Sequence, residues 1–273
     1  DTAAIQSILS SISIHCGADG PESTMEAIYQ AATGDGYDQN CNGSYDGGED
    51  VRPFLADATD PFGGAGGEFW SPSYSGGGPI GGFGFRDYAL PVIFYATDNY
   101  LRDPESGYAT PGGCPVNAGA SDVTAAVTDI GARLIGLGTN STPVSQMNSL
   151  ADSTGSMADT DGDGSTDDRL VFTWSSSSTA FRSTIVGAIE DLVNSVEFST
   201  VELVIVGDTW GFVRSVDPAI YTGVSVTSGS SLTLDFTILL QAVLPPSPDD
   251  RVFTIELHAI GDGAVSLGFI ELV

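Results

Sequence analysis

Oxygen-bearing side chains recur at every second position in residues 38–49, which read DQNCNGSYDGGE. Calcium is a hard cation that binds about six to eight oxygens, and a twelve-residue loop with ligands at positions 1, 3, 5, 7, 9 and 12 encloses it. Glycine at position 6, here Gly43, permits the sharp turn. No helix is expected after this segment, so we predict an isolated calcium loop, with a solvated polar turn as the alternative. The expected ligands are Asp38, Asn40, Asn42, Ser44, Asp46 and Glu49.

A second acidic segment, DTDGDGSTDD at residues 159–168, repeats the first positions of this pattern. Position 12 is Leu170, so we expect Asp168 to supply the acidic ligand in its place. Carboxylates this close together repel one another unless a cation binds them. We therefore predict a second calcium site, with a flexible acidic loop as the alternative. The expected ligands are Asp159, Asp161, Asp163, Ser165, Asp167 and Asp168.

A third group of carboxylates is expected at the edge of a parallel sheet. Asp19 and Glu22 come just before a predicted helix, and Asp98 ends the apolar run LPVIFYATD, which predicts a strand buried on both faces. Ligands of open α/β sheets bind at the carboxyl ends of the strands, where these residues would lie. The alternative for Glu22 is that it complements the dipole of the helix that follows it.

The elements that must position these residues alternate between strand and helix from residue 88 to residue 195. Strands are predicted at residues 90–98, 133–139 and 169–175. Helices are predicted at residues 2–14, 23–34, 121–134, 144–155 and 181–195. Ser23 with Glu26 matches a capping box, Gly34 ends that helix, and Ser121 is the expected cap of the helix after it. This part is predicted to be α/β, and residues 35–87 form a glycine-rich insertion in it.

The hydrophobic period changes to two after residue 195. Residues 198–206, 231–240 and 251–260 alternate apolar with polar side chains, and turn residues separate them. This pattern predicts a small antiparallel, Ig-like β-sandwich. We expect two domains, at residues 1–195 and 196–273.

The composition restricts the classes of partner. The chain has 36 acidic and 8 basic residues, for a formal net charge of −28, so nucleic acid and anionic lipid are poor partners, and no nucleic acid is expected to bind. It contains no apolar run of about 18 residues, so no membrane insertion is expected. Its odd number of cysteines leaves the pairing of Cys16, Cys41 and Cys114 open. Calcium-type loops, the absence of lysine and abundant Gly, Ser and Thr favour an extracellular or cell-surface bacterial protein.

Residues 1–195 resemble a von Willebrand factor type A (vWA) domain, particularly the I-like domain of integrin β subunits. The family motif D-x-P-E is matched by Asp19, Pro21 and Glu22, and the strand that ends in T-D is matched by Thr97 and Asp98. The resemblance implies a Rossmann-type open sheet. It also implies an adhesion site at which Ca²⁺ or Mg²⁺, held by Asp19, Glu22 and Asp98, binds an acidic residue of a protein partner.

The sequence departs from the family at one point. The family's first strand, with its D-x-S-x-S motif, lies well before D-x-P-E, whereas only eighteen residues precede Asp19 here. We therefore expect a vWA-like domain without its amino-terminal half. The chain would then be a fragment or a cleavage product, or another chain would supply the missing strands.

These features predict a secreted or surface calcium-binding protein of vWA type that mediates adhesion or protein–protein contact. The alternative is a structural subunit of a calcium-stabilised filament or surface layer, whose neighbours are copies of itself. We do not expect an enzyme, because no side chain is paired with a base suited to nucleophilic or hydrolytic chemistry.

Overall fold

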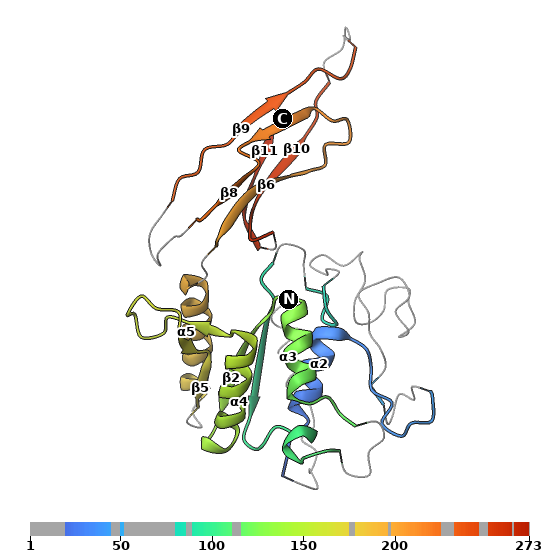
Figure 1. The fold of residues 1–273 in the computed structure, drawn as a ribbon, viewed down its shortest axis with the longest axis vertical. Helices are drawn as coiled ribbons and strands as arrows, with labels where there is room; N and C mark the ends of the chain where they lie inside the picture. Colours follow the sequence, from blue (N-terminus) through green and yellow to red (C-terminus); the bar gives the residue numbers. More distant parts are fainter. Residues whose placement is uncertain are drawn as a thin grey trace.

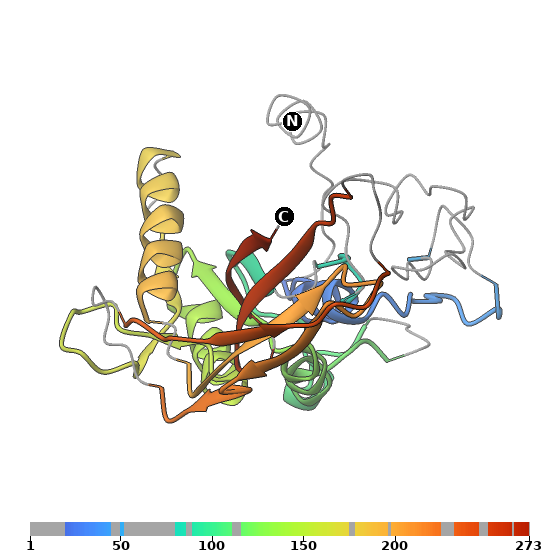
Figure 2. The ribbon, with the colours of Figure 1, turned by 90° about the horizontal axis from the view of Figure 1, so that it is seen from above.

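A computed structural model describes two groups of elements, an α/β part and an antiparallel β part (Figure 1). The described residues are 20–44, 50–51, 80–85, 89–110, 116–174, 178–195, 198–224, 232–245, 251–263 and 265–272. The helix predicted at residues 2–14 lies outside them. In both views β10 and β11 of the second group lie side by side (Figure 1 and Figure 2).

In the part of the chain that the structure describes, the α/β part is built on a parallel sheet of three strands in the order β1-β2-β5. These strands are β1 (Val92–Thr97), β2 (Arg133–Gly138) and β5 (Val171–Thr173). Five of the six residues of β2 are buried, as the apolar run predicts for a central strand covered on both faces. The predicted α/β organisation with parallel strands is confirmed.

Helices cover both faces of this sheet. They are α2 (Thr24–Thr33), α3 (Ala120–Asp129), α4 (Ser141–Thr154) and α5 (Ser178–Ser195), with a short 3₁₀ helix η1 (Pro104–Ser106). Leu134 of β2 packs in one apolar cluster with residues of α2, α3 and α4, and its neighbour Ile135 packs in another with Ala188 and Leu192 of α5. Since neighbouring strand residues face opposite sides, the helices form two layers around the sheet.

The helix predicted at 23–34 is present and ends at Gly34, which adopts the left-handed conformation (φ 70°). Its predicted capping box is wrong, because the Ser23 side chain makes no capping hydrogen bond. Glu26 instead accepts hydrogen bonds from Gln30 Nε2 (2.8 Å) and from the backbone N–H of Ala118 (2.7 Å). A long-range contact therefore ties α2 to the start of α3.

The helix predicted at 121–134 is shorter than expected. It begins at Ala120, so Ser121 lies inside it, and it ends at Asp129 before Gly131 turns the chain with φ 63°. Leu134, the last residue of the predicted helix, is instead buried in β2 beside Ile93. The apolar spacing of this region fits both assignments, and the sheet pairing decides between them.

Within its described residues, the antiparallel part holds six strands in two sheets, one ordered β11-β10-β6-β8 and one formed by β7 and β9. The strands are β6 (Thr200–Val206), β7 (Val213–Asp217), β8 (Ile220–Thr222), β9 (Thr237–Leu240), β10 (Ile255–Gly261) and β11 (Val265–Leu272). Leu203, Ile238 and Leu257 line one groove between the two sheets. The predicted antiparallel pairing is confirmed, whereas β7, β8 and β11 were not predicted.

The Asp262 carboxylate binds the first residues of the antiparallel part through hydrogen bonds. Asp262 Oδ1 accepts hydrogen bonds from the backbone and side chain of Ser199 (3.0 and 2.8 Å) and of Thr200 (2.8 and 3.1 Å). Partial burial acts to raise the pKa of Asp262, but these hydrogen bonds outweigh it and hold the pKa below its ordinary value. Asp262 therefore joins the β10–β11 turn to the first residues of β6.

Candidate calcium-binding loops

The second acidic loop is closed by a short hairpin. Strands β3 (Met157–Ala158) and β4 (Asp168–Arg169) pair antiparallel, with Ala158 opposite Asp168. The guanidinium of Arg169 donates to both carboxylate oxygens of Asp152 on α4 (2.6 and 3.0 Å), which fixes the hairpin to that helix. The register places Asp159, the next residue after β3, beside Asp168 at the start of β4.

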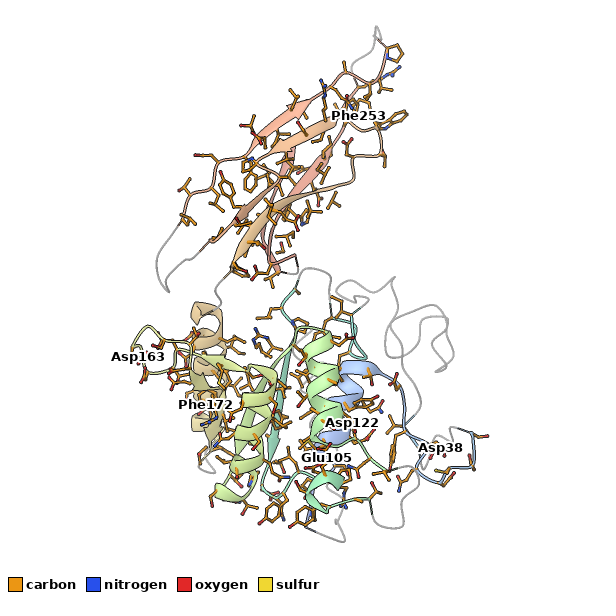
Figure 3. All side chains as sticks on the ribbon, in the orientation of Figure 1. Asp38, Glu105, Asp122, Asp163, Phe172 and Phe253 are labelled. Carbon is orange, nitrogen blue, oxygen red and sulfur yellow. The ribbon has the colours of Figure 1, made fainter. Side chains whose placement is uncertain are left out.

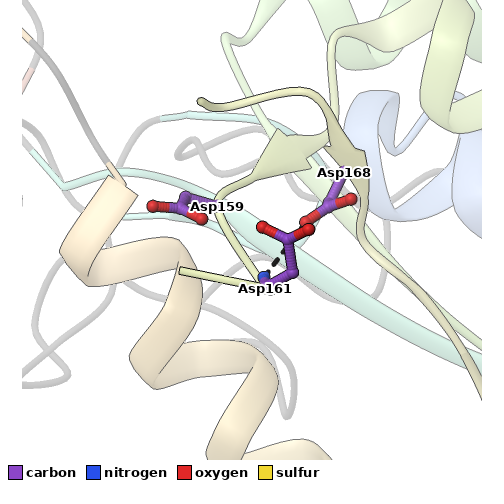
Figure 4. Close-up of side chains that lie close together, drawn as sticks. All are labelled: Asp159, Asp161 and Asp168. Atoms are coloured by element: carbon purple, nitrogen blue, oxygen red, sulfur yellow. Dashed lines mark hydrogen bonds between the residues drawn. The ribbon is translucent and has the colours of Figure 1, made fainter. Parts of the chain in front are cut away.

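Three carboxylates converge in this loop, as Figure 4 shows. One oxygen from each of Asp159, Asp161 and Asp168 lies within 4.8 Å of the other two. Asp168 Oδ2 accepts hydrogen bonds from the Thr160 hydroxyl (2.9 Å), the Thr160 backbone (3.0 Å) and the Asp161 backbone (3.1 Å). These hydrogen bonds hold the pKa of Asp168 below its ordinary value, and the bond from the Thr160 side chain has the largest effect. The carboxylate is therefore charged at neutral pH.

Side chains of the same loop also accept hydrogen bonds from its own backbone N–H groups at regular intervals, an arrangement that we call the turn ladder. Asp159 accepts from the N–H groups of Gly162 (2.7 Å) and Gly164 (3.0 Å), which are the fourth and sixth positions. Asp161, at the third position, accepts a hydrogen bond from the Asp163 N–H (3.1 Å). Asp163, at the fifth position, accepts one from the Ser165 N–H (2.8 Å). Both glycines have positive φ, 79° and 88°. Asx-type turns of this kind wind the backbone around the carboxylates.

The first loop shows a similar ladder, with acceptors at the same first, third and fifth positions. Asp38 accepts from the Gly43 N–H (2.8 Å), Asn40 accepts from the Asn42 N–H (2.9 Å), and Asn42 accepts from the Ser44 N–H (2.7 Å). Positive φ again falls at the fourth and sixth positions, at Cys41 (52°) and Gly43 (79°). Two segments far apart in the chain thus share one backbone form, and both lie at the periphery of the α/β part (Figure 3).

The first loop is also closed at its ends. Tyr37 and Val51 form an antiparallel bridge through two backbone hydrogen bonds (2.7 and 3.0 Å), and Asp50 accepts from the Gln39 N–H (2.9 Å). The Tyr37 hydroxyl donates to the Thr110 hydroxyl (3.2 Å), which links the loop to the α/β part. The expected ligands Asp46 and Glu49 lie outside the described residues.

The second loop fits calcium by donor type and by spacing. Calcium binds oxygens at about 2.3–2.6 Å, so two ligands of one ion are at most about 5 Å apart, and the three carboxylates meet this limit. Asp163 and Asp167, which were also expected as ligands, are not in this cluster. In the first loop, the described donors are all oxygen-bearing residues, of which Asp38 is half-buried and Asn40, Asn42 and Ser44 are exposed.

The structure places two members of the expected adhesion site at the same edge of the parallel sheet. Glu22 forms a parallel bridge with Leu101, just beyond β1, and Asp98 directly follows β1. Both residues are exposed, and the Asp98 carbonyl accepts a hydrogen bond from Asn140 Nδ2 (2.9 Å). Asp19 lies outside the described residues. Within the described ranges, Glu22 and Asp98 belong to no group of three possible metal ligands.

Sequence reasoning missed several residues that shape the loops. Thr160 donates a hydrogen bond to the Asp168 carboxylate of the second loop, and Asp50 accepts one from the backbone of the first. The Tyr37–Val51 bridge closes the first loop. Cys41 is disulfide-bonded. The signal for Asp50 was available, since it directly follows the twelfth position, but the bridge depends on pairing between residues that are distant in sequence.

The sequence matches no protein-family model, and a search of curated proteins finds no relative. Among the helices in the described ranges, none has both the length and the apolar composition required to cross a bilayer.

Proposed function

We propose that this chain is a secreted or cell-surface calcium-binding protein that mediates adhesion or protein–protein contact through a vWA-like α/β part. The observation that carries the proposal is the shared turn ladder of residues 38–44 and 159–165, with three carboxylate oxygens converging in the second loop. In the second loop Asp159, Asp161 and Asp168 would hold the ion. A bound calcium ion supplies the positive charge that offsets the repulsion of these carboxylates.

Three further features support the location and the partner class. The disulfide of Cys41 is typical of oxidising, extracytoplasmic compartments. The net charge of −28 favours divalent cations over nucleic acid or anionic lipid. Glu22 and Asp98 share the carboxyl edge of the sheet, where open α/β folds bind ligands. We assign the adhesion surface, with Ca²⁺ or Mg²⁺, to this edge, and the antiparallel Ig-like part to a spacer or second contact.

Calorimetric titration with calcium tests this proposal. We expect wild-type protein to bind with Kd on the order of 10⁻⁴–10⁻³ M, the range of extracellular calcium modules. The double variant Asp159→Asn/Asp161→Asn is expected to lose the heat of one site. The double variant Asp129→Asn/Asp235→Asn removes the same charge at exposed positions outside the loops and is the matched control. Binding that is unchanged in the loop variant, or equally weakened in the control, would reject the assignment.

A second candidate function is a structural subunit of a calcium-stabilised extracellular filament or surface layer. The observation that favours it is the position of β1 as the outermost strand of the parallel sheet that the described residues form. Outermost strands are common sites of strand addition from a neighbouring subunit. Electron microscopy in calcium and after chelation distinguishes the two. Long particles that dissociate on chelation favour the filament, and single copies in both conditions favour the adhesion protein.

A further inference from the structure

The first loop contains the one Asn-Gly dipeptide of the sequence, Asn42-Gly43. Glycine after asparagine leaves the following amide nitrogen unhindered, so this dipeptide is the most prone to intramolecular attack on the side-chain amide. Both residues are exposed, and a Cβ added to Gly43 would meet no atom within 4 Å. Both residues are therefore accessible to solvent, and the space beside Gly43 is open.

The turn ladder brings these two groups together. Asn42 Oδ1 accepts a hydrogen bond from the Ser44 N–H (2.7 Å), which folds the Asn42 side chain back along the peptide that joins it to Gly43. The Gly43 N–H donates to Asp38 Oδ2 (2.8 Å), so a proton acceptor is already in contact with the nitrogen that must lose its proton. Gly43 has φ 79°, a conformation that a side chain at this position would disfavour.

We propose that Asn42 is a site of spontaneous deamidation that converts the fifth ligand position of the first loop from an amide to a carboxylate. Gly43 N attacks Asn42 Cγ, the bond from Cγ to Nδ2 breaks, and ammonia leaves with the proton released from the Gly43 nitrogen. Water then opens the cyclic imide. Opening at one carbonyl yields aspartate, and opening at the other yields isoaspartate, whose backbone is longer by one carbon.

The second loop shows what the aspartate product would resemble. It carries Asp163 at the fifth position and holds the same hydrogen bond from the seventh, Ser165 (2.8 Å). Converting Asn42 to aspartate therefore keeps the ladder and adds one negative charge among the ligands, and calcium affinity rises with ligand charge. Isoaspartate lengthens the backbone inside the ladder and removes the spacing on which the loop depends. The effect on affinity rests on the proposed calcium function, whereas the modification itself does not.

Mass spectrometry of protein aged in heavy-oxygen water at mildly alkaline pH tests the proposal. The expected result is conversion of Asn42 to acid, with one heavy oxygen incorporated, faster than at any other asparagine. Asn148, followed by Ser149 within α4, is the internal control because the helix holds its backbone. The variant Asn42→Gln is expected to lose the conversion. An Asn42 that stays intact, or converts no faster than Asn148, overturns the proposal.

A second measurement separates the modification from the calcium function. Asn42→Asp is expected to bind calcium with a Kd about five- to tenfold lower than freshly prepared wild type. Conversion of Asn42 in a chain that calorimetry shows to bind no calcium would uphold the modification and reject the proposed function. Absence of conversion in a chain that binds calcium would reject the modification and uphold the proposed calcium function.

Discussion

Substitution of Gly136 by alanine tests the contact between β1, β2 and α4 on which the carboxyl edge of the sheet depends. Gly136 lies opposite Tyr95 of β1 in the parallel register. A Cβ at this position would lie 2.9 Å from the Tyr95 hydroxyl oxygen, 3.1 Å from its Cζ and 3.3 Å from Met147 Sδ. Tyr95 and Met147 are both buried, so the new methyl group has no empty space to enter.

The expected loss of stability follows from two opposing effects. Overpacking of a filled core costs about 1–3 kcal/mol. Replacing glycine by alanine lowers the conformational entropy of the unfolded chain, which stabilises the folded protein by about 0.4–1 kcal/mol. Taking the middle of each range, the net destabilisation is about 1.3 kcal/mol and at most about 2.6 kcal/mol. Each kcal/mol lowers the unfolding temperature by about 2–4 °C for a domain of this size. Urea unfolding followed by circular dichroism measures it.

The hydroxyl of Tyr95 allows a sharper version of this experiment. Burial raises the pKa of Tyr95, and among the described residues none forms a hydrogen bond with its hydroxyl. Tyr95→Phe should therefore be nearly neutral by itself, because it removes a buried polar group without leaving a partner unsatisfied. In that background Gly136→Ala should cost about 1 kcal/mol less, since the 2.9 Å contact is gone.

A matched control is available in α5. A Cβ at Gly187 would meet no atom within 4 Å, so Gly187→Ala in this helix should stabilise the protein by about 0.5–1 kcal/mol. If Gly136→Ala is as stable as wild type, or stabilises like Gly187→Ala, then Tyr95 does not lie over Gly136. The parallel register of β1 and β2 would then be wrong.

Three further predictions concern the loops and the second part. Calcium at about 10 mM should raise the unfolding free energy by about 1.4–2.7 kcal/mol per site if Kd is about 10⁻⁴–10⁻³ M, and chelation should abolish the gain. Asp38→Ala with Glu49→Ala should make residues 35–87 protease-sensitive even in calcium; unchanged resistance would contradict the first loop's role. Because folding lowers the pKa of Asp262, its stabilising effect is present above the unfolded value of about 3.9 and disappears as pH falls through the folded value. The stability difference between wild type and Asp262→Asn should therefore vanish in acid, and a difference that grows as pH falls would refute this assignment.

Much of the local structure could be predicted from short-range chemistry. Gly34 ends α2 because glycine adopts the left-handed conformation without strain, and the helix stops where the sequence predicts. The apolar run of β1 and the acidic spacing of both loops are equally local signals. The side chains at the first, third and fifth positions of each loop accept hydrogen bonds from backbone N–H groups only a few residues away, so these turns depend on the local spacing of Asp, Asn, Ser and Gly.

Other assignments failed because a distant partner competed with the local one. Glu26 was expected to cap its own helix, but its carboxylate reaches the Ala118 backbone, ninety-two residues away. Leu134 fits the spacing of α3 but is buried in β2, where it pairs with Ile93 of β1. The strand β11 was missed because its alternation is interrupted where the apolar residues Phe269 and Ile270 are adjacent, and its pairing with β10 was needed to reveal it.

By itself, the sequence determined the α/β order of the first part, the change to antiparallel strands after residue 195 and the ligand spacing of two oxygen-rich loops. These follow from side-chain periodicity and from bonds made within a few residues. Only the tertiary structure decided which carboxylates meet. Asp168 joins Asp159 and Asp161 because β3 and β4 pair in one register, whereas Asp163 and Asp167 do not join the cluster. Convergence depends on pairing between separate strands, which spacing along the chain does not encode.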